Sequence, residues 1–125
     1  MTYKVISLIV EDHDNFIHIL ADTNSKQAMV IDPAWDGVGI KEELEAEGLD
    51  LVGILITHSH YDHINAVNEL YQEGVSLFVG EDELPLWVDC PKDAVLLADG
   101  DQIQFGSSMI SVIKTAGHTQ GSVCY

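Results

Sequence analysis

The feature that most constrains this chain is the run Thr57-His58-Ser59-His60-Tyr61-Asp62-His63, which stands between an expected strand and an expected helix. The apolar residues 51–56 before it are typical of a buried strand. Residues 64–71 after it carry apolar side chains at helical spacing. Ligands and chemistry gather at the carboxyl ends of strands in α/β sheets. The sequence therefore predicts a functional site at this strand end.

The spacing within the run suits metal ligands. In extended backbone His58 and His60 point the same way, so they can present two imidazoles to one cation. Asp62 and His63, on the turn into the helix, face elsewhere and can serve a second cation. Imidazole and carboxylate together suit zinc, iron or manganese, with zinc the default. The alternative is a polar loop, but three histidines and an aspartate at one strand end favour metal binding.

Three motifs carry a resemblance to a known family. The run His58-Ser59-His60-Tyr61-Asp62-His63 looks like the H-x-H-x-D-H signature of the metallo-β-lactamase superfamily of hydrolases. Gly117-His118-Thr119-Gln120-Gly121-Ser122 resembles that family's G-H-T-x-G-S signature, and Val30-Ile31-Asp32-Pro33 resembles its I-D-P turn. Asp14-Asn15-Phe16 and Val123-Cys124-Tyr125 lean towards the glyoxalase II branch, which cleaves glutathione thioesters.

The resemblance implies a set of metal ligands and a reaction. His58, His60 and His118 would hold a first cation with an open fourth position, the pattern of a catalytic zinc. Asp62 and His63 would belong to a second site. The implied reaction is hydrolysis of an acyl or thioester substrate by a metal-bound hydroxide. Asp62 would hold the second cation or, in a one-metal site, act as general base.

Two residues near the expected site have two interpretations each. Asp32 ends a strand that we expect to lie parallel to residues 51–56. It is either a carboxylate that orients a ligand histidine or a turn aspartate before proline. Trp87 either walls a substrate pocket or caps the core.

The remaining patterns predict an α/β fold with a mixed sheet. Residues 5–10, 16–20 and 29–31 are expected to form an antiparallel meander, followed by helices at 40–46 and 63–73 and a strand at 75–79. Residues 81–94 read as irregular, and 102–105 with 109–115 as a β-hairpin.

The resemblance implies one half of a four-layer αββα sandwich. Residues 1–125 would be the N-terminal half of the domain, because the sequence has no aspartate after residue 101 and no histidine after residue 118 to supply the family's later ligands. One apolar sheet face, from residues 5–10, 54–56 and 109–113, would then be exposed. We therefore expect a homo-oligomer, a dimer, if the chain is complete.

Composition limits the partners. A net charge of −16, from 21 acidic and five basic residues, argues against nucleic acid. No apolar run approaches a membrane span, and the N-terminus does not resemble a signal peptide. Cys90 and Cys124 read as reduced thiols, which favours the cytoplasm. The favoured function is a metal-dependent hydrolase of small acyl or thioester compounds. The alternative is a non-catalytic metal-binding half-domain or assembly module.

Overall fold

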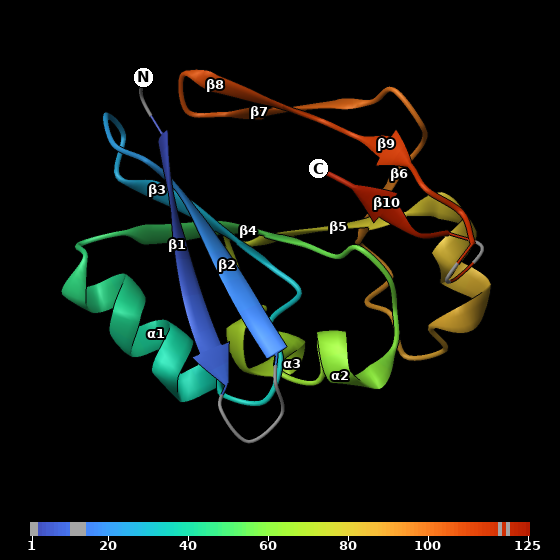
Figure 1. Cartoon of the computed structure of the whole chain (residues 1–125), viewed down its shortest axis with the longest axis horizontal. Helices are drawn as coiled ribbons and strands as arrows, with labels where there is room; N and C mark the ends of the chain where they lie inside the picture. The colour runs from blue at the N-terminus through green and yellow to red at the C-terminus, as the bar shows by residue number, and fades with distance from the viewer. Residues whose placement is uncertain (1–2, 11–14, 118, 120) are drawn as a thin grey trace.

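A mixed sheet of six strands forms the centre of the protein, with the strands in the order β1-β2-β3-β4-β5-β6 (Figure 1). The computed structural model describes residues 3–10, 15–117, 119 and 121–125. The six strands are β1 (Tyr3–Val10), β2 (Asn15–Asp22), β3 (Gln27–Ile31), β4 (Asp50–Leu55), β5 (Ser76–Gly80) and β6 (Val95–Leu97). The first three pair antiparallel, which confirms the predicted meander, and β3 to β6 pair parallel.

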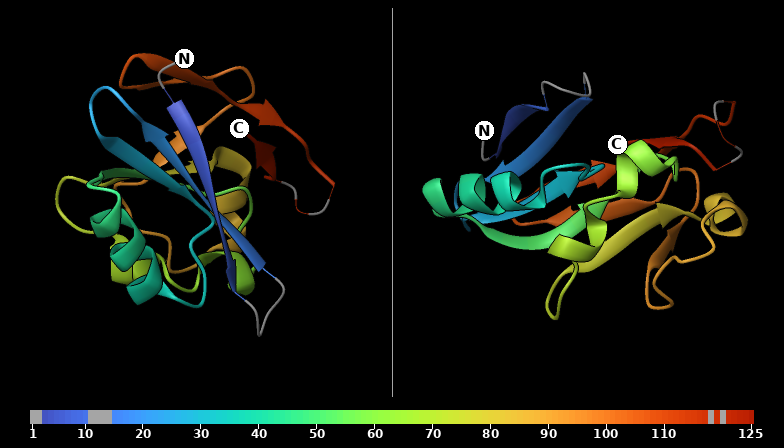
Figure 2. Two further views of the ribbon diagram at one scale, coloured as in Figure 1. Left: turned by 60° about the vertical axis from the view of Figure 1, so that its left-hand side comes forward. Right: turned by 90° about the horizontal axis from the view of Figure 1, so that it is seen from below.

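Helices cover one face of this sheet (Figures 1 and 2). They are α1 (Gly37–Ala46), α2 (Tyr61–Ile64) and α3 (Val67–Leu70). Asp36 caps α1 by accepting a hydrogen bond from Gly39 N at 2.9 Å, which satisfies a backbone donor at the start of the helix. Ile40 on α1 and Leu70 on α3 are buried against Ile54 of β4. The alternation of strand and helix along the chain thus forms one hydrophobic core on this side.

Four short strands lie over the opposite face (Figure 1). They are β7 (Gln102–Phe105), β8 (Ser108–Ser111), β9 (Ile113–Lys114) and β10 (Val123–Cys124). Strands β7 and β8 form the predicted hairpin. A second core packs Phe105 and Ile110 of this hairpin against Met29 of β3 and Leu55 of β4. The chain therefore has three layers, the helices, the main sheet, and the short strands.

The expectation that residues 54–56 lie on a water-exposed face was wrong. Ile54 and Ile56 are fully buried in the helix-side core, and Leu55 is fully buried because the β7–β8 hairpin folds back over the side of β4 that the helices do not cover. Exposed apolar surface remains at the rim, where Val5 is 52% and Met109 51% exposed. These two residues line a groove of about 320 Å³ between β1 and β8.

The predicted helix over 63–73 was also wrong, because it is two short helices separated at Asn65 and Ala66. Ala66 N donates to Pro33 O at 3.2 Å, and Asn65 Oδ1 accepts from Trp35 N at 2.5 Å. These contacts tie the break to the turn after β3.

Two further segments differ from the predictions. The segment predicted as irregular begins with a 3-10 helix, η2 (Glu81–Leu86), and strand β6 was not predicted. The second hairpin strand is interrupted at Val112, whose N–H donates to Asp101 O at 2.9 Å. No helix in the described ranges is long and apolar enough to span a membrane.

Candidate metal centre

The candidate centre begins where β3 and β4 end side by side. Because these strands are parallel, Asp32 after β3 and Thr57 after β4 lie at the same edge of the sheet. Thr57 N donates to Asp32 Oδ1 at 2.7 Å, and Thr57 Oγ1 donates to Asp32 Oδ2. Asp32 has a left-handed backbone with φ of 48°, a conformation that aspartate tolerates better than most residues. The two strand ends are thus locked together by one buried carboxylate.

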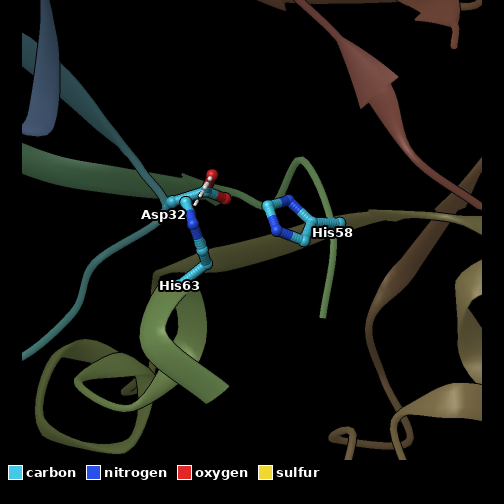
Figure 3. A group of neighbouring side chains, drawn as sticks. All are labelled: Asp32, His58 and His63. Atoms are coloured by element: carbon cyan, nitrogen blue, oxygen red, sulfur yellow. Dashed lines mark hydrogen bonds and ion pairs between the residues drawn. The ribbon is translucent and has the colours of Figure 1, made fainter. Parts of the chain in front are cut away.

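Asp32, His58 and His63 converge at this edge (Figure 3). One ligand atom from each of the three lies within 4.8 Å of the others. The rings of His58 and His63 have centroids 4.2 Å apart. Two imidazoles suit zinc and related divalent cations, and a carboxylate beside them can serve either as a third ligand or as the group that orients the rings. The residues present therefore fit a divalent metal.

Hydrogen bonds fix the tautomers of both rings. His63 Nδ1 lies 3.1 Å from Asp32 Oδ2, and a carboxylate can only accept, so Nδ1 carries the proton. The Thr57 hydroxyl gives its hydrogen to Asp32, so its oxygen accepts from His58 Nδ1 at 2.9 Å. Both arrangements place the ring lone pair on Nε2, the atom that a cation would bind.

The same carboxylate sets the electrostatics of His63. Its hydrogen bond to Asp32 raises the pKa of His63 above 6.5, against the lowering effect of burial, and the charges of Asp32 and Asp62 add to the rise. His63 Nε2 lies 3.8 Å from Asp62 Oδ2. An imidazole nitrogen and a carboxylate oxygen thus face the same space, as a second cation site requires.

Two of the other residues predicted for the site, His60 and Asp62, lie beside this group. His60 is the N-cap residue of α2, and its ring centroid lies 4.8 Å from that of His58. Asp62 is exposed in the first turn of α2. His118 lies outside the described residues. Its sequence neighbour Thr119 is described. The Thr119 hydroxyl donates a hydrogen bond to a carboxylate that also accepts one from Ser59 N, between His58 and His60.

That carboxylate belongs to Glu83, which the sequence reasoning missed. Glu83 is fully buried at the start of η2, where β5 ends. It accepts hydrogen bonds from Ser59 N, Thr119 Oγ1 and Gly121 N. Its position just after a parallel strand was a usable signal, but the acidic neighbours Glu81 and Asp82 make it look like part of a solvated surface.

Thr119 and residues 121–125 lie across the ends of β4 and β5. Val123 N donates to Thr57 O at 3.0 Å, and Tyr125 Oη donates to Ile56 O at 2.5 Å. A Cβ on Gly80 would collide with Gly121 O, so glycine at 80 permits this close approach. Trp87 packs partly buried against the helix-side core, which agrees with its interpretation as a core cap.

Comparisons with known proteins identify the family. The sequence model of the Metallo-beta-lactamase superfamily matches residues 17–125. A relative from Bacillus velezensis, described as "Probable polyketide biosynthesis zinc-dependent hydrolase BaeB", is 36% identical over 127 aligned positions, which cover 99% of this chain and 56% of the relative. A hydroxyacylglutathione hydrolase from Rippkaea orientalis is 36% identical over 115 positions, which cover 90% of this chain and 43% of that protein.

Solved structures show the same fold. A metallo-beta-lactamase from Staphylococcus aureus superposes with a TM-score of 0.86 at 19% identity, covering 98% of this chain and 36% of that one. ETHE1 from Myxococcus xanthus gives a TM-score of 0.79 at 24% identity, covering 96% and 52%. The chain spans about half the length of the curated relatives that it matches. From the matched family model, the fold and the three motifs, this chain belongs to the metallo-beta-lactamase superfamily.

Proposed function

We propose that this chain is the metal-binding half of a zinc-dependent hydrolase that cleaves thioesters or other activated acyl compounds. The observation that carries the proposal is the convergence of Asp32, His58 and His63 at the ends of two parallel strands. Membership of the superfamily supports it, as do the printed descriptions of the relatives, a probable zinc-dependent hydrolase and a hydroxyacylglutathione hydrolase.

Each residue of the centre has a distinct role in this proposal. His58 and His60, with His118, hold a first cation, and His63 with Asp62 holds a second. Asp32 orients rather than binds, because its Oδ2 already accepts from Thr57 Oγ1 and His63 Nδ1. When bound, the cation lowers the pKa of a water towards about 7 and polarises the acyl carbonyl.

Asp62 is the proton acceptor in the proposal if the second site is not filled. Its carboxylate is exposed in the first turn of α2 and lies beside His63 Nε2, so it can take a proton from water near the centre. Serine or cysteine nucleophiles are not needed in this chemistry. Ser59 instead donates its backbone N–H to Glu83.

The net charge of the chain and its free cysteines support proposals for the substrate class and for the cellular location. A net charge of −16 disfavours phosphate-rich substrates, so we propose small acyl or thioester compounds rather than nucleic acid. Free thiols at Cys90 and Cys124 support a cytoplasmic location. The alternative function is a metal-binding half-domain or assembly module without turnover.

The test measures metal and turnover separately. Protein purified without chelator is analysed for zinc, iron and manganese, and then assayed on a glutathione thioester, a matched oxygen ester and a single-stranded nucleic acid. We expect bound metal, thioester cleavage that chelation abolishes and zinc restores, and loss of both in His58→Ala. Metal without turnover would support the half-domain alternative, and absence of metal binding would refute both.

A further inference from the structure

Glu83 is a buried carboxylate outside the predicted ligand set. Its side chain is fully buried, and an ionised group taken from water is costly unless hydrogen bonds replace its hydration. Burial raises the pKa of Glu83, but its hydrogen bonds to Ser59, Thr119 and Gly121 together outweigh this effect, and the pKa lies below the ordinary 4.5. Glu83 is therefore an anion held by donors from other segments.

The two oxygens of Glu83 contact two different segments. Oε1 accepts from Ser59 N at 2.5 Å, and Oε2 accepts from Thr119 Oγ1 at 2.8 Å and Gly121 N at 3.1 Å. Ser59 lies between His58 and His60, and Thr119 follows His118 in sequence. Glu83 thus connects Ser59, which stands between two predicted ligands, with Thr119, which follows a third predicted ligand far along the chain.

Further contacts hold Thr119 and Gly121 in place beside Glu83. Thr119 N donates to Ser122 Oγ at 3.1 Å, and the two hydroxyl oxygens lie 2.6 Å apart, so Ser122 holds the Thr119 side chain beside Glu83. A Cβ on Gly121 would collide with Glu83 N, so the segment packs directly against the start of η2.

We propose that Glu83 is a positioning residue of the metal centre, which fixes the loop carrying His58 and His60 relative to Thr119, the sequence neighbour of His118. This inference rests on the proposed function. Metal ligands must be held within about 0.5 Å of their productive geometry. Loss of a residue that supports the ligands reduces metal affinity by about 10- to 100-fold. Glu83→Gln should produce a loss in this range, because an amide retains one acceptor and presents a donor to the others.

Asp22 provides a matched control. It is also buried, and its carboxylate accepts from Ser25 N at 3.1 Å, Ser25 Oγ at 2.5 Å and Ser107 Oγ at 3.3 Å. Asp22 lies opposite Gln27 in the β2–β3 pair, at the start of β3, whereas the candidate centre lies beyond the other end of β3, where Asp32 follows the strand. Asp22→Asn therefore removes a similar buried anion at the opposite end of the sheet.

The experiment measures zinc affinity by competition with a chromophoric chelator in the full chain, well below the unfolding temperature of each variant. We expect Glu83→Gln to lose about 10- to 100-fold in zinc affinity and Asp22→Asn to keep the wild-type value, although both lower the melting temperature. Thr119→Val removes a single donor and should lose less, and Thr119→Ser should restore the wild-type affinity. These milder variants serve if Glu83→Gln does not fold.

The outcomes separate the two proposals. If the wild-type chain binds no zinc, the proposed function fails irrespective of Glu83. If the wild type binds zinc and the Glu83 and Thr119 variants keep its affinity, Glu83 is only structural. An equal loss in Asp22→Asn would attribute the effect to global stability and overturn the positioning role.

Discussion

Asp32→Asn is the sharpest test of the candidate centre. The two side chains have the same shape, and asparagine tolerates the left-handed backbone at this position, so neither a cavity nor backbone strain is introduced. The change removes one negative charge and replaces one acceptor by a donor. The amide would keep its oxygen towards Thr57 N and direct its nitrogen at Thr57 Oγ1 and His63 Nδ1.

This inversion should change both histidines. An NH₂ group facing His63 Nδ1 requires that nitrogen to accept, which moves the proton to Nε2. The Thr57 hydroxyl, which would now accept from the amide, can turn its hydrogen towards His58 Nδ1, with the same consequence. Each ring would then present a proton where a cation should bind. We expect zinc affinity to fall by about 10- to 100-fold.

The stability loss should be moderate. A hydrogen bond to a charged group contributes about 1.5–3 kcal/mol and a neutral one about 1 kcal/mol, so making the three bonds to Thr57 and His63 neutral should cost about 1.5–3 kcal/mol in total. Each kcal/mol changes the melting temperature of a domain of this size by roughly 3–5 °C. We therefore expect the metal-free variant to melt about 5–15 °C below the wild type.

The pH dependence of the metal-free protein gives an independent measure. The pKa of His63 is raised in the folded state, so its contribution to stability is fully present below pH 6.5 and is lost as pH rises through the folded pKa. Asp32→Asn removes the main cause of the rise and should flatten this slope. Calorimetry across neutral pH measures the slope, and chelator competition measures the affinity.

Asp36→Asn is the control for the same chemical change. Asp36 caps α1 through Gly39 N, and asparagine caps helices equally well. Asp36→Asn should leave the zinc affinity, the pH dependence of stability and the melting temperature nearly unchanged. Wild-type zinc affinity together with an unchanged pH slope in Asp32→Asn would refute the tautomer argument.

Further predictions follow from other parts of the structure. The pKa of Glu83 is lowered in the folded state, so its contribution to folding stability is present above pH 4.5 and is lost as pH falls through the folded pKa. The urea midpoint of Glu83→Gln should therefore fall less at acidic pH than that of the wild type. Leu55→Ala, in the core under the β7–β8 hairpin, should cost about 2–5 kcal/mol in chemical denaturation, whereas Val88→Ala at a 93% exposed position should cost almost nothing. His60→Ala should lower the metal content measured by elemental analysis, and full content would remove His60 from the ligand set. The homodimer stays a prediction, and we expect the groove between β1 and β8 to be its contact surface. Sedimentation should show a dimer that depends on protein concentration and that Met109→Glu disrupts. A monomer at every concentration would contradict the prediction.

Local patterns predicted most of the sheet. The apolar run that became β4 and the hairpin β7–β8 are short-range signals, because side-chain alternation and turn residues act within a few positions. The parallel pairing of β3 and β4 brought Asp32 to the predicted edge of the site. Those inferences needed only the order of elements along the chain.

Features that depend on distant contacts were not predictable in this way. The helix break at Asn65 reflects its hydrogen bond to Trp35 N, which no periodicity within residues 63–73 can reveal. The covered face of β4 depends on where the hairpin folds, and a sequence pattern does not specify that. Glu83 looked like part of an acidic surface because its three donors come from elsewhere in the fold.

The position of Thr119 and residues 121–125 has a consequence for protein synthesis. This segment supplies Thr119 and Gly121 to Glu83 and donors to Ile56 O and Thr57 O. A ribosome completes β4 and its histidine loop well before these residues are translated. On a nascent chain, Glu83 therefore has its Ser59 donor but neither of the other two. Under the proposed role of Glu83, zinc loading at full affinity is therefore expected to follow release of Thr119 and Gly121 from the exit tunnel.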